Sequence, residues 1–316
     1  MDHGTAIEAT KAVVTLDVAL PGIVWGWMIT LNMWAKSIGT GVILVGAFLL
    51  YRHKKDDMPN LRWLMPLISF VALNIFLLFT LLDLHQPLRM WHIFVYPHFD
   101  SAITVGAWMA TLFTGLITIM ALIGFLDQHQ DFRRHCALAK RVRGVSDVYE
   151  NIFPFVAVLA IPVTLYTAVI MAESSARELW QAPTELVQML MAAFMAGSAI
   201  LLFIADRWSE SAKKDLALVM MLSVAFSFLM YMGEYFFSFK SAEAEVTLTY
   251  VHAGGEYNVQ FWFAMFFGFI APFFIALSSL KNYNETLMKF AAITTLVGLY
   301  LAKDVWLKIP QLLPLS

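Results

Sequence analysis

Eight long apolar stretches constrain the fold of this chain more than any other feature. They lie near residues 23–51, 63–84, 102–126, 152–172, 186–206, 216–238, 259–280 and 287–307. A helix needs about 20 mostly apolar residues to cross the hydrocarbon core of a bilayer. The composition agrees, because 60% of the residues are hydrophobic and 14% are charged, whereas soluble domains are about 25% charged. The sequence therefore predicts an all-α, polytopic membrane protein with eight transmembrane helices.

The whole chain, residues 1–316, is expected to form a single integral membrane domain in which the eight helices divide into two four-helix bundles. Lysine and arginine predict its orientation, because cytoplasmic loops of membrane proteins are enriched in both. Fourteen of the 21 lysines and arginines fall in or beside alternate connections, at residues 52–62, 127–151, 207–214 and 281–289. These connections are predicted to be cytoplasmic, and both chain termini are then predicted to be extracytoplasmic.

The segment between residues 79 and 101 combines acids, bases and aromatic rings where the second apolar stretch ends. Asp83 and His85 come at the end of the stretch, and Pro87 prevents the helix from continuing. The next positions add Arg89, Trp91, His92, Tyr96 and His98. Such a group at the point where a helix leaves the hydrocarbon indicates the mouth of a site for a small amphiphilic molecule.

Lys36 is the most conspicuous polar residue inside an apolar stretch. An ionisable side chain within a membrane span is costly and calls for a partner or a function. Asn32 lies four residues earlier, on the same helical face, and Asp83 and Glu234 are candidate partners. Lys36 can donate a proton or a hydrogen bond to a ligand oxygen, or form an ion pair that joins two helices. The sequence leaves both roles open.

Three further polar residues lie in or near the apolar stretches. Pro162 frees a backbone carbonyl in the fourth stretch, and Tyr166 follows one turn later. The Tyr166 phenol can donate to a ligand carbonyl or belong to an interfacial belt of aromatic residues. Glu234, in the sixth stretch, can be a proton route or the partner of Lys36. Lys303, near the outer end of the last stretch, is expected to snorkel toward the interface.

Several classes of function are disfavoured by composition. The net charge of −2 gives no reason to expect nucleic-acid binding. The single cysteine, Cys136, cannot hold an iron–sulfur cluster. Membrane haem b requires two histidines deep within helices, whereas all eight histidines of this chain fall in loops or near helix ends. We therefore expect no haem, no iron–sulfur cluster and no metal site in this chain.

Three segments, taken together, resemble the NrfD/polysulfide reductase family of membrane subunits. They read WGWMITLNMWAKSIGTG in the first stretch, LLDLHQPLRMWHIF and SAITVGAWMATL around the second and third, and IPVTLYTAVIMAESSARELWQAPTEL around the fourth and fifth. They cover most of residues 25–190, and the second half of the chain matches more diffusely. The resemblance implies an eight-helix subunit of a bacterial cytoplasmic (inner) membrane that binds menaquinone or ubiquinone near the outer face.

The resemblance also implies partners and site residues. Such a subunit anchors a four-cluster, ferredoxin-like iron–sulfur subunit on the extracytoplasmic face, usually joined to a molybdopterin or multihaem catalytic subunit, and is not active alone. The acidic connections 173–185 and 239–258 fit a docking surface for that partner, or equally a pair of solvated connectors. Asn32, Tyr166 and Asp83 match quinone-contact positions of the family, whereas Lys36 and Ala168 depart from its glycine-rich pattern.

The predicted site combines these residues. Asp83 and Lys36 are the candidate catalytic groups, and the candidate quinone contacts are Asn32, Lys36, Asp83, His85, Tyr166 and Glu234. A quinol needs a donor or acceptor at each of its two oxygens and a group that takes its protons. Without haem, electrons cannot cross the membrane within this chain, so the quinol has to react on the face where the iron–sulfur subunit docks.

Three functions stay open at this point. The first is a quinol-oxidising or quinone-reducing subunit that exchanges electrons with a peripheral iron–sulfur subunit. The second is a secondary transporter, because intramembrane charges and proline-broken helices also mark transporters. Against it, the polar residues gather near the outer end and not at the midplane. The third is a structural anchor that binds no quinone.

Overall fold

The computed structural model describes residues 22–84, 86–129, 146–174, 177–237 and 242–313. Eight spans within these ranges are long and apolar enough to cross a membrane. No β-strand occurs in the described residues. The prediction of an all-α membrane protein with eight spanning segments is therefore confirmed.

Seven of the spans are single α-helices. They are α2 (Trp27–Arg52), α3 (Leu61–Asp83), α5 (Ala102–Gln128), α8 (Ser146–Glu173), α9 (Ala182–Leu202), α10 (Glu210–Phe237) and α14 (Glu285–Lys308). The other span combines α12 (Asn258–Phe263), the π-helical segment η4 (Ala264–Ile270) and α13 (Ala271–Lys281). Helices α8 and α10 each begin six residues before the predicted apolar stretch, because their polar first turns extend beyond the hydrocarbon segment.

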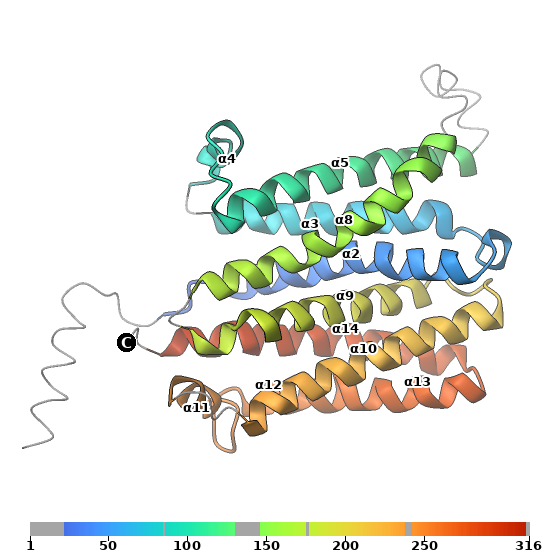
Figure 1. Ribbon diagram of the computed structural model, residues 1–316. Coiled ribbons are helices and arrows are strands. Elements are labelled where there is room, and N and C mark those ends of the chain that lie inside the picture. Colours follow the sequence, from blue (N-terminus) through green and yellow to red (C-terminus); the bar gives the residue numbers. More distant parts are fainter. Residues whose placement is uncertain (1–21, 85, 130–145, 175–176, 238–241, 314–316) are drawn as a thin grey trace, which may run out of the picture.

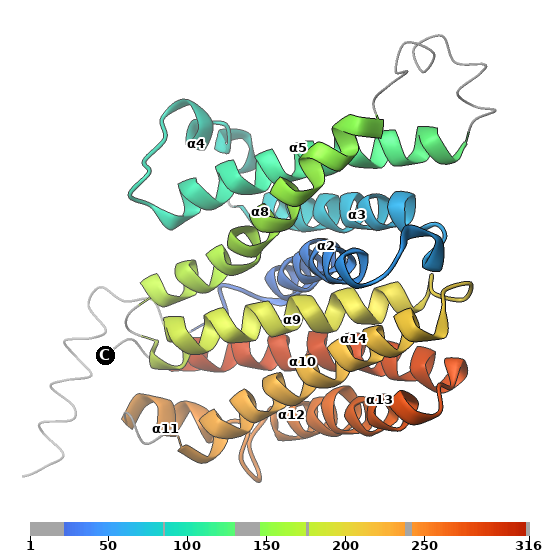
Figure 2. The same ribbon diagram turned by 45° about the vertical axis from the view of Figure 1, so that its right-hand side comes forward.

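The spans lie side by side, with α2 near the centre of the molecule (Figure 1). Helices α3, α5 and α8 lie on one side of α2, and α9, α10, α14 and the α12–α13 span lie on the other side in both views (Figures 1 and 2). Helix α2 packs as extensively on α9 as on α3. The division into two four-helix bundles therefore stays a prediction, as does the location of the termini.

The crossing of α2 and α9 depends on two glycines. A Cβ atom on Gly41 would lie 1.9 Å from the carbonyl oxygen of Ala193, and one on Gly197 would lie 2.3 Å from the Gly41 backbone. Both distances are far shorter than van der Waals contact, so only glycine fits at either position. These two glycines therefore let the backbones of the two helices approach closely.

The two ends of the molecule differ in their polar contacts. At one end, ion pairs join the helices, among them Arg52–Asp215 at 2.6 Å and Lys213–Glu285 at 3.1 Å. At the other end, the Gln311 side chain accepts hydrogen bonds from the backbone N–H groups of Val24 and Trp25, both at 2.9 Å. The first end carries the connections predicted to be cytoplasmic. The second carries the start of α2, the end of α14 and the segment around Asp83.

Orientation can be measured with the single cysteine. Cys136 lies outside the described residues, within the connection 127–151 that is predicted to be cytoplasmic. We expect a membrane-impermeant maleimide to label Cys136 only after cells are permeabilised. A Cys136→Ser/Thr249→Cys variant should be labelled in intact cells, because Thr249 is exposed in a predicted extracytoplasmic connection. Labelling in the reverse order would invert the predicted topology.

Candidate functional site

Lys36 is fully buried in α2 and is held by two neighbouring residues of α8. Its ammonium donates a hydrogen bond to the Thr167 hydroxyl and lies 4.5 Å from the centroid of the Tyr166 ring. No ion pair joins Lys36 to an acid in the described part of the chain, so neither expected partner, Asp83 or Glu234, neutralises it directly. An ammonium has three N–H donors, and Thr167 accepts one of them.

Tyr166 fits against α5 because residue 106 is glycine. A Cβ atom on Gly106 would lie 2.2 Å from the Tyr166 ring. Tyr166 as a whole is partly buried, whereas Lys36 is fully buried. A desolvated cation–π contact of this kind contributes about 2 kcal/mol. Tyr166 therefore helps to fix the position of Lys36.

Asn32 and Asp83 lie on the path from Lys36 to the end of the bundle. Asn32, one turn before Lys36 on α2, donates through its amide nitrogen to the Phe76 carbonyl at 2.8 Å and to the Thr80 hydroxyl at 2.5 Å. Asp83 follows Thr80 by three residues and ends α3, so it lies on the same helical face. The amide nitrogen of Asn32 is thus hydrogen-bonded to α3. The side-chain carbonyl oxygen of Asn32 is the group that can accept a hydrogen bond from a ligand.

The two remaining predicted residues are not joined to Lys36. His85 lies outside the described residues. Glu234 of α10 accepts a hydrogen bond from the Thr184 hydroxyl of α9 at 3.0 Å. The structure thus brings Lys36 together with Tyr166, connects Asn32 to the helix that ends at Asp83, and places Glu234 in a second group of polar residues.

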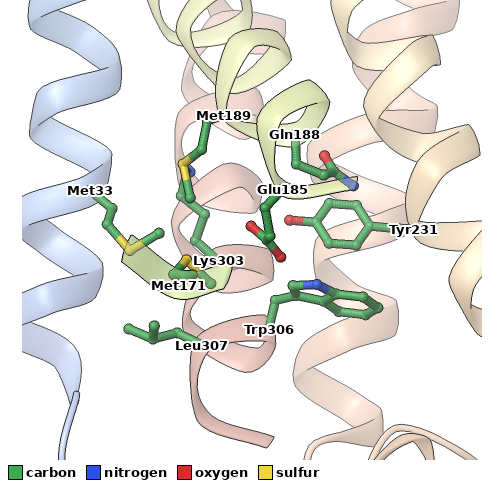
Figure 3. A pocket seen from close by; sticks show the side chains of 9 residues that line it. All are labelled: Met33, Met171, Glu185, Gln188, Met189, Tyr231, Lys303, Trp306 and Leu307. Atoms are coloured by element: carbon green, nitrogen blue, oxygen red, sulfur yellow. The ribbon is translucent and has the colours of Figure 1, made fainter. Parts of the chain in front are cut away.

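The polar residues beside Glu234, but not Glu234 itself, line a small buried cavity next to Lys36 (Figure 3). The lining residues come from five helices and are Met33, Met171, Glu185, Gln188, Met189, Tyr231, Lys303, Trp306 and Leu307. The cavity measures about 10 Å³, which is close to the space that one water molecule requires. Met33 lies three residues before Lys36 on α2, so the cavity and the Lys36 site are neighbours on one helical face.

Glu185 of α9 and Lys303 of α14 both line this cavity (Figure 3). Their exposed fractions are 2% and 5%, so the expectation that Lys303 snorkels to the interface is wrong. The Lys303 ammonium donates to the Met189 thioether sulfur at 3.3 Å, which is a weak acceptor. One Glu185 oxygen, Oε1, and the Trp306 indole N–H make no hydrogen bond within the described residues.

The neighbouring acid, Asp304, has a different role. It accepts hydrogen bonds from Thr30 of α2 at 3.0 Å, from Gln260 of α12 at 3.0 Å, and from Lys308 at 2.7 Å. Asp304 therefore joins three helices. Glu185 and Lys303, by contrast, line the cavity, and Glu185 Oε1 has no hydrogen-bond partner among the described residues.

Sequence reasoning missed Glu185, Lys303, Gly106 and Thr167 as members of the site. The acidic connection predicted at 173–185 includes Glu185, but α9 begins at Ala182 and carries this residue into its buried first turn. Thr167 and Gly106 stand next to Tyr166 only because α8 packs on both α2 and α5. The tyrosine–threonine pair on α8 was visible in the sequence, but the helix it faces was not.

These groups determine which chemical steps the site can support. Lys36 and Tyr166 can donate hydrogen bonds to a ligand oxygen, and Asp83, Glu185 and Glu234 can take up protons. Within the described ranges, no group of three or more histidine, cysteine, aspartate or glutamate side chains could hold a metal ion. The absence of haem, clusters and metals stays a prediction.

Comparison with known proteins identifies the family. The family model described as "Polysulphide reductase, NrfD" matches residues 18–310, nearly the whole chain. The match includes the second half, where the sequence resemblance was diffuse. No curated protein sequence matches the chain. The chain therefore belongs to the NrfD family, whose members are membrane subunits of respiratory oxidoreductase complexes and assemble with iron–sulfur and catalytic subunits.

Proposed function

We propose that this chain binds menaquinol or ubiquinol and exchanges its electrons with a four-cluster iron–sulfur subunit docked on the extracytoplasmic face of a bacterial inner membrane. The observation that carries the proposal is the Lys36 ammonium, fully buried, hydrogen-bonded to Thr167 and stacked on Tyr166. A buried cation without a carboxylate partner is costly. A ligand oxygen that bears partial or full negative charge offsets that cost, and a quinone offers such an oxygen.

The residues around Lys36 suit the two ends of a quinol. Lys36 and Tyr166 hydrogen-bond one quinol oxygen. The Asn32 carbonyl and Asp83 serve the other quinol oxygen, toward the end of the helices where α3 ends. Asp83 is the last residue of α3, and this carboxylate takes up the proton that leaves a quinol hydroxyl. Electrons leave to the iron–sulfur subunit, and this chain supplies binding, orientation and proton uptake. The same groups serve quinone reduction in reverse.

The transporter alternative has less support. The polar groups that contact Lys36 and Asn32 lie toward one end of the helices, whereas transporter sites lie near the midplane. Membership of a family of oxidoreductase subunits also favours electron transfer. Substrate uptake by this chain alone, reconstituted in vesicles, would instead support a transporter.

The proposal is tested on the complex purified through a tag on this chain. We expect an iron–sulfur subunit to co-purify, and we expect Tyr166→Phe to lower the rate of quinol oxidation about tenfold, because one hydrogen bond to the ligand is lost. The matched control is Tyr51→Phe, since the Tyr51 side chain is 91% exposed. Electron transfer from an artificial donor to the catalytic subunit should be unchanged in both variants. Wild-type quinol oxidation by Tyr166→Phe would contradict the proposed contact.

A further inference from the structure

We infer that Glu185, Lys303 and Trp306 hold one water molecule and that this group forms a proton-binding site inside the membrane domain. The site is separate from the proposed quinone contacts, and its proton binding does not depend on them. Its use as an acceptor for a quinol proton rests on the proposed function.

The first observation is the match between the cavity and its polar atoms. Glu185, Lys303 and Trp306 all line the cavity of about 10 Å³, and Glu185 Oε1 and the Trp306 indole N–H make no hydrogen bond within the described residues. A buried water is stable where it makes two to four hydrogen bonds to groups that otherwise have no partner. A water in this cavity accepts from Trp306 or Lys303 and donates to Glu185. These three residues therefore supply the donors and the acceptor that one water needs.

The second observation is that Gln188, another polar side chain of the cavity, is already hydrogen-bonded to α10. Gln188 donates to the Ser227 carbonyl at 3.3 Å and accepts from the Ser227 hydroxyl at 2.6 Å. Both bonds fix Gln188 against α10, so it forms part of the wall. The protonatable part of the cavity thus reduces to the Glu185 carboxylate and the Lys303 ammonium, with the Tyr231 hydroxyl beside them (Figure 3).

A single proton changes the net charge of the group of residues around Glu185 and Lys303. The titratable groups facing this region are Lys36 from α2, Tyr166 from α8, Tyr231 and Glu234 from α10, and Asp304 with its partner Lys308 on α14. Asp304 and Lys308 neutralise each other at 2.7 Å. Lys36 and Lys303 are close enough to repel each other. With Glu185 and Glu234 ionised, the two lysines are balanced, and one added proton changes the net charge of the group from zero to plus one.

Glu234 lies near this site, toward the extracytoplasmic end, but does not line the cavity. It accepts a hydrogen bond from Thr184 at 3.0 Å and is only partly buried. A proton that binds Glu185 comes from the water and forms an O–H bond on the carboxylate, and it returns to the water when that bond breaks. Proton transfer needs no electron acceptor, so the step is balanced by the proton alone.

The experiment is pH-induced infrared difference spectroscopy on the full chain in lipid nanodiscs, without quinone. We expect a C=O stretching band of a buried carboxylic acid that shifts in D₂O, is absent in Glu185→Gln and is retained in Glu245→Gln. Glu245 is the matched control, because it is an exposed acid of α11 (Ala242–Leu248). A band that is unchanged in Glu185→Gln, or a wild-type spectrum without such a band, would overturn the inference.

A second variant keeps the test decisive if Glu185→Gln does not fold. Trp306→Phe removes only the indole N–H from the cavity and keeps an aromatic ring. We expect the carboxylic band to shift in frequency, because the hydrogen bonding of the water that contacts Glu185 changes. An unshifted band would overturn the proposed water contact. Because no quinone is present, a negative result here leaves the quinol-oxidation assay with Tyr166→Phe as an independent test of the proposed function.

Discussion

Replacing Lys36 by methionine is expected to lower quinol oxidation by the assembled complex by about a hundredfold or more, the range in which a proton donor or acceptor contributes to a reaction. Methionine keeps the length and apolar volume of the side chain but removes the cation that faces Tyr166 and Thr167. The measurement is the initial rate with a reduced quinone analogue, at equal amounts of assembled complex. Removing a buried cation without a carboxylate partner should leave the fold intact or more stable.

The control for this prediction is Lys54→Met. Lys54 is exposed near the end of the bundle that carries the predicted cytoplasmic connections. The Lys54→Met substitution removes the same charge from the chain but lies away from the site, so quinol oxidation should stay at the wild-type rate. Asp83→Asn is expected to behave like Lys36→Met, because it removes the proposed proton acceptor at the outer end. If Lys36→Met and Asp83→Asn both retained full activity, the quinone site would have to lie elsewhere.

The second large effect is expected at the crossing of α2 and α9. Gly41→Ala places a methyl group 1.9 Å from the Ala193 carbonyl oxygen, and the backbone of α9 has to move away. Overpacking of this severity costs about 3 kcal/mol. The chain should therefore lose thermal stability and accumulate at lower levels in the membrane, which fluorescence-detected size-exclusion chromatography measures after heating.

A glycine on the same scaffold gives the matched control. A Cβ atom on Gly115 of α5 would meet nothing within 4 Å. Gly115→Ala should be neutral or stabilising by up to about 1 kcal/mol, because alanine favours a helix over glycine. The two substitutions are chemically identical and are expected to act in opposite directions. Equal stability of the two variants would show that α2 and α9 do not approach as closely as the structure has them.

The spans could be predicted from the sequence because their signal is local. Length and apolar composition alone mark a membrane helix, and a lysine such as Lys36 stands out inside one. Ion-pair partners could not be predicted in the same way. Asp83 and Glu234 were reasonable partners for Lys36 by chemistry, but α2 faces α8 at this level, so Tyr166 and Thr167 contact it instead.

Glu185 and Lys303 escaped prediction for a related reason. Each lies near the end of its apolar stretch, where an acid is typical of a connection and a lysine is typical of snorkelling. Their burial depends on five helices closing around one cavity, and no local pattern records that arrangement. The Trp306 indole N–H and Glu185 Oε1 have no hydrogen-bond partner among the described residues, and only the positions of the packed side chains show this. Local composition predicts which segments cross the membrane, whereas packing decides which polar groups meet.

The central claim is that a quinone reacts beside Lys36, toward the end of the helices that carries Asp83. Photoaffinity labelling of the purified complex with an azido-quinone, followed by peptide mapping, tests this most directly. The account predicts cross-links to the α2 segment around Lys36 and the α8 segment around Tyr166, and their loss when excess unlabelled quinone competes. Cross-links at the opposite end instead, around Arg62 and Tyr149, whose guanidinium and ring lie 4.8 Å apart, would contradict it.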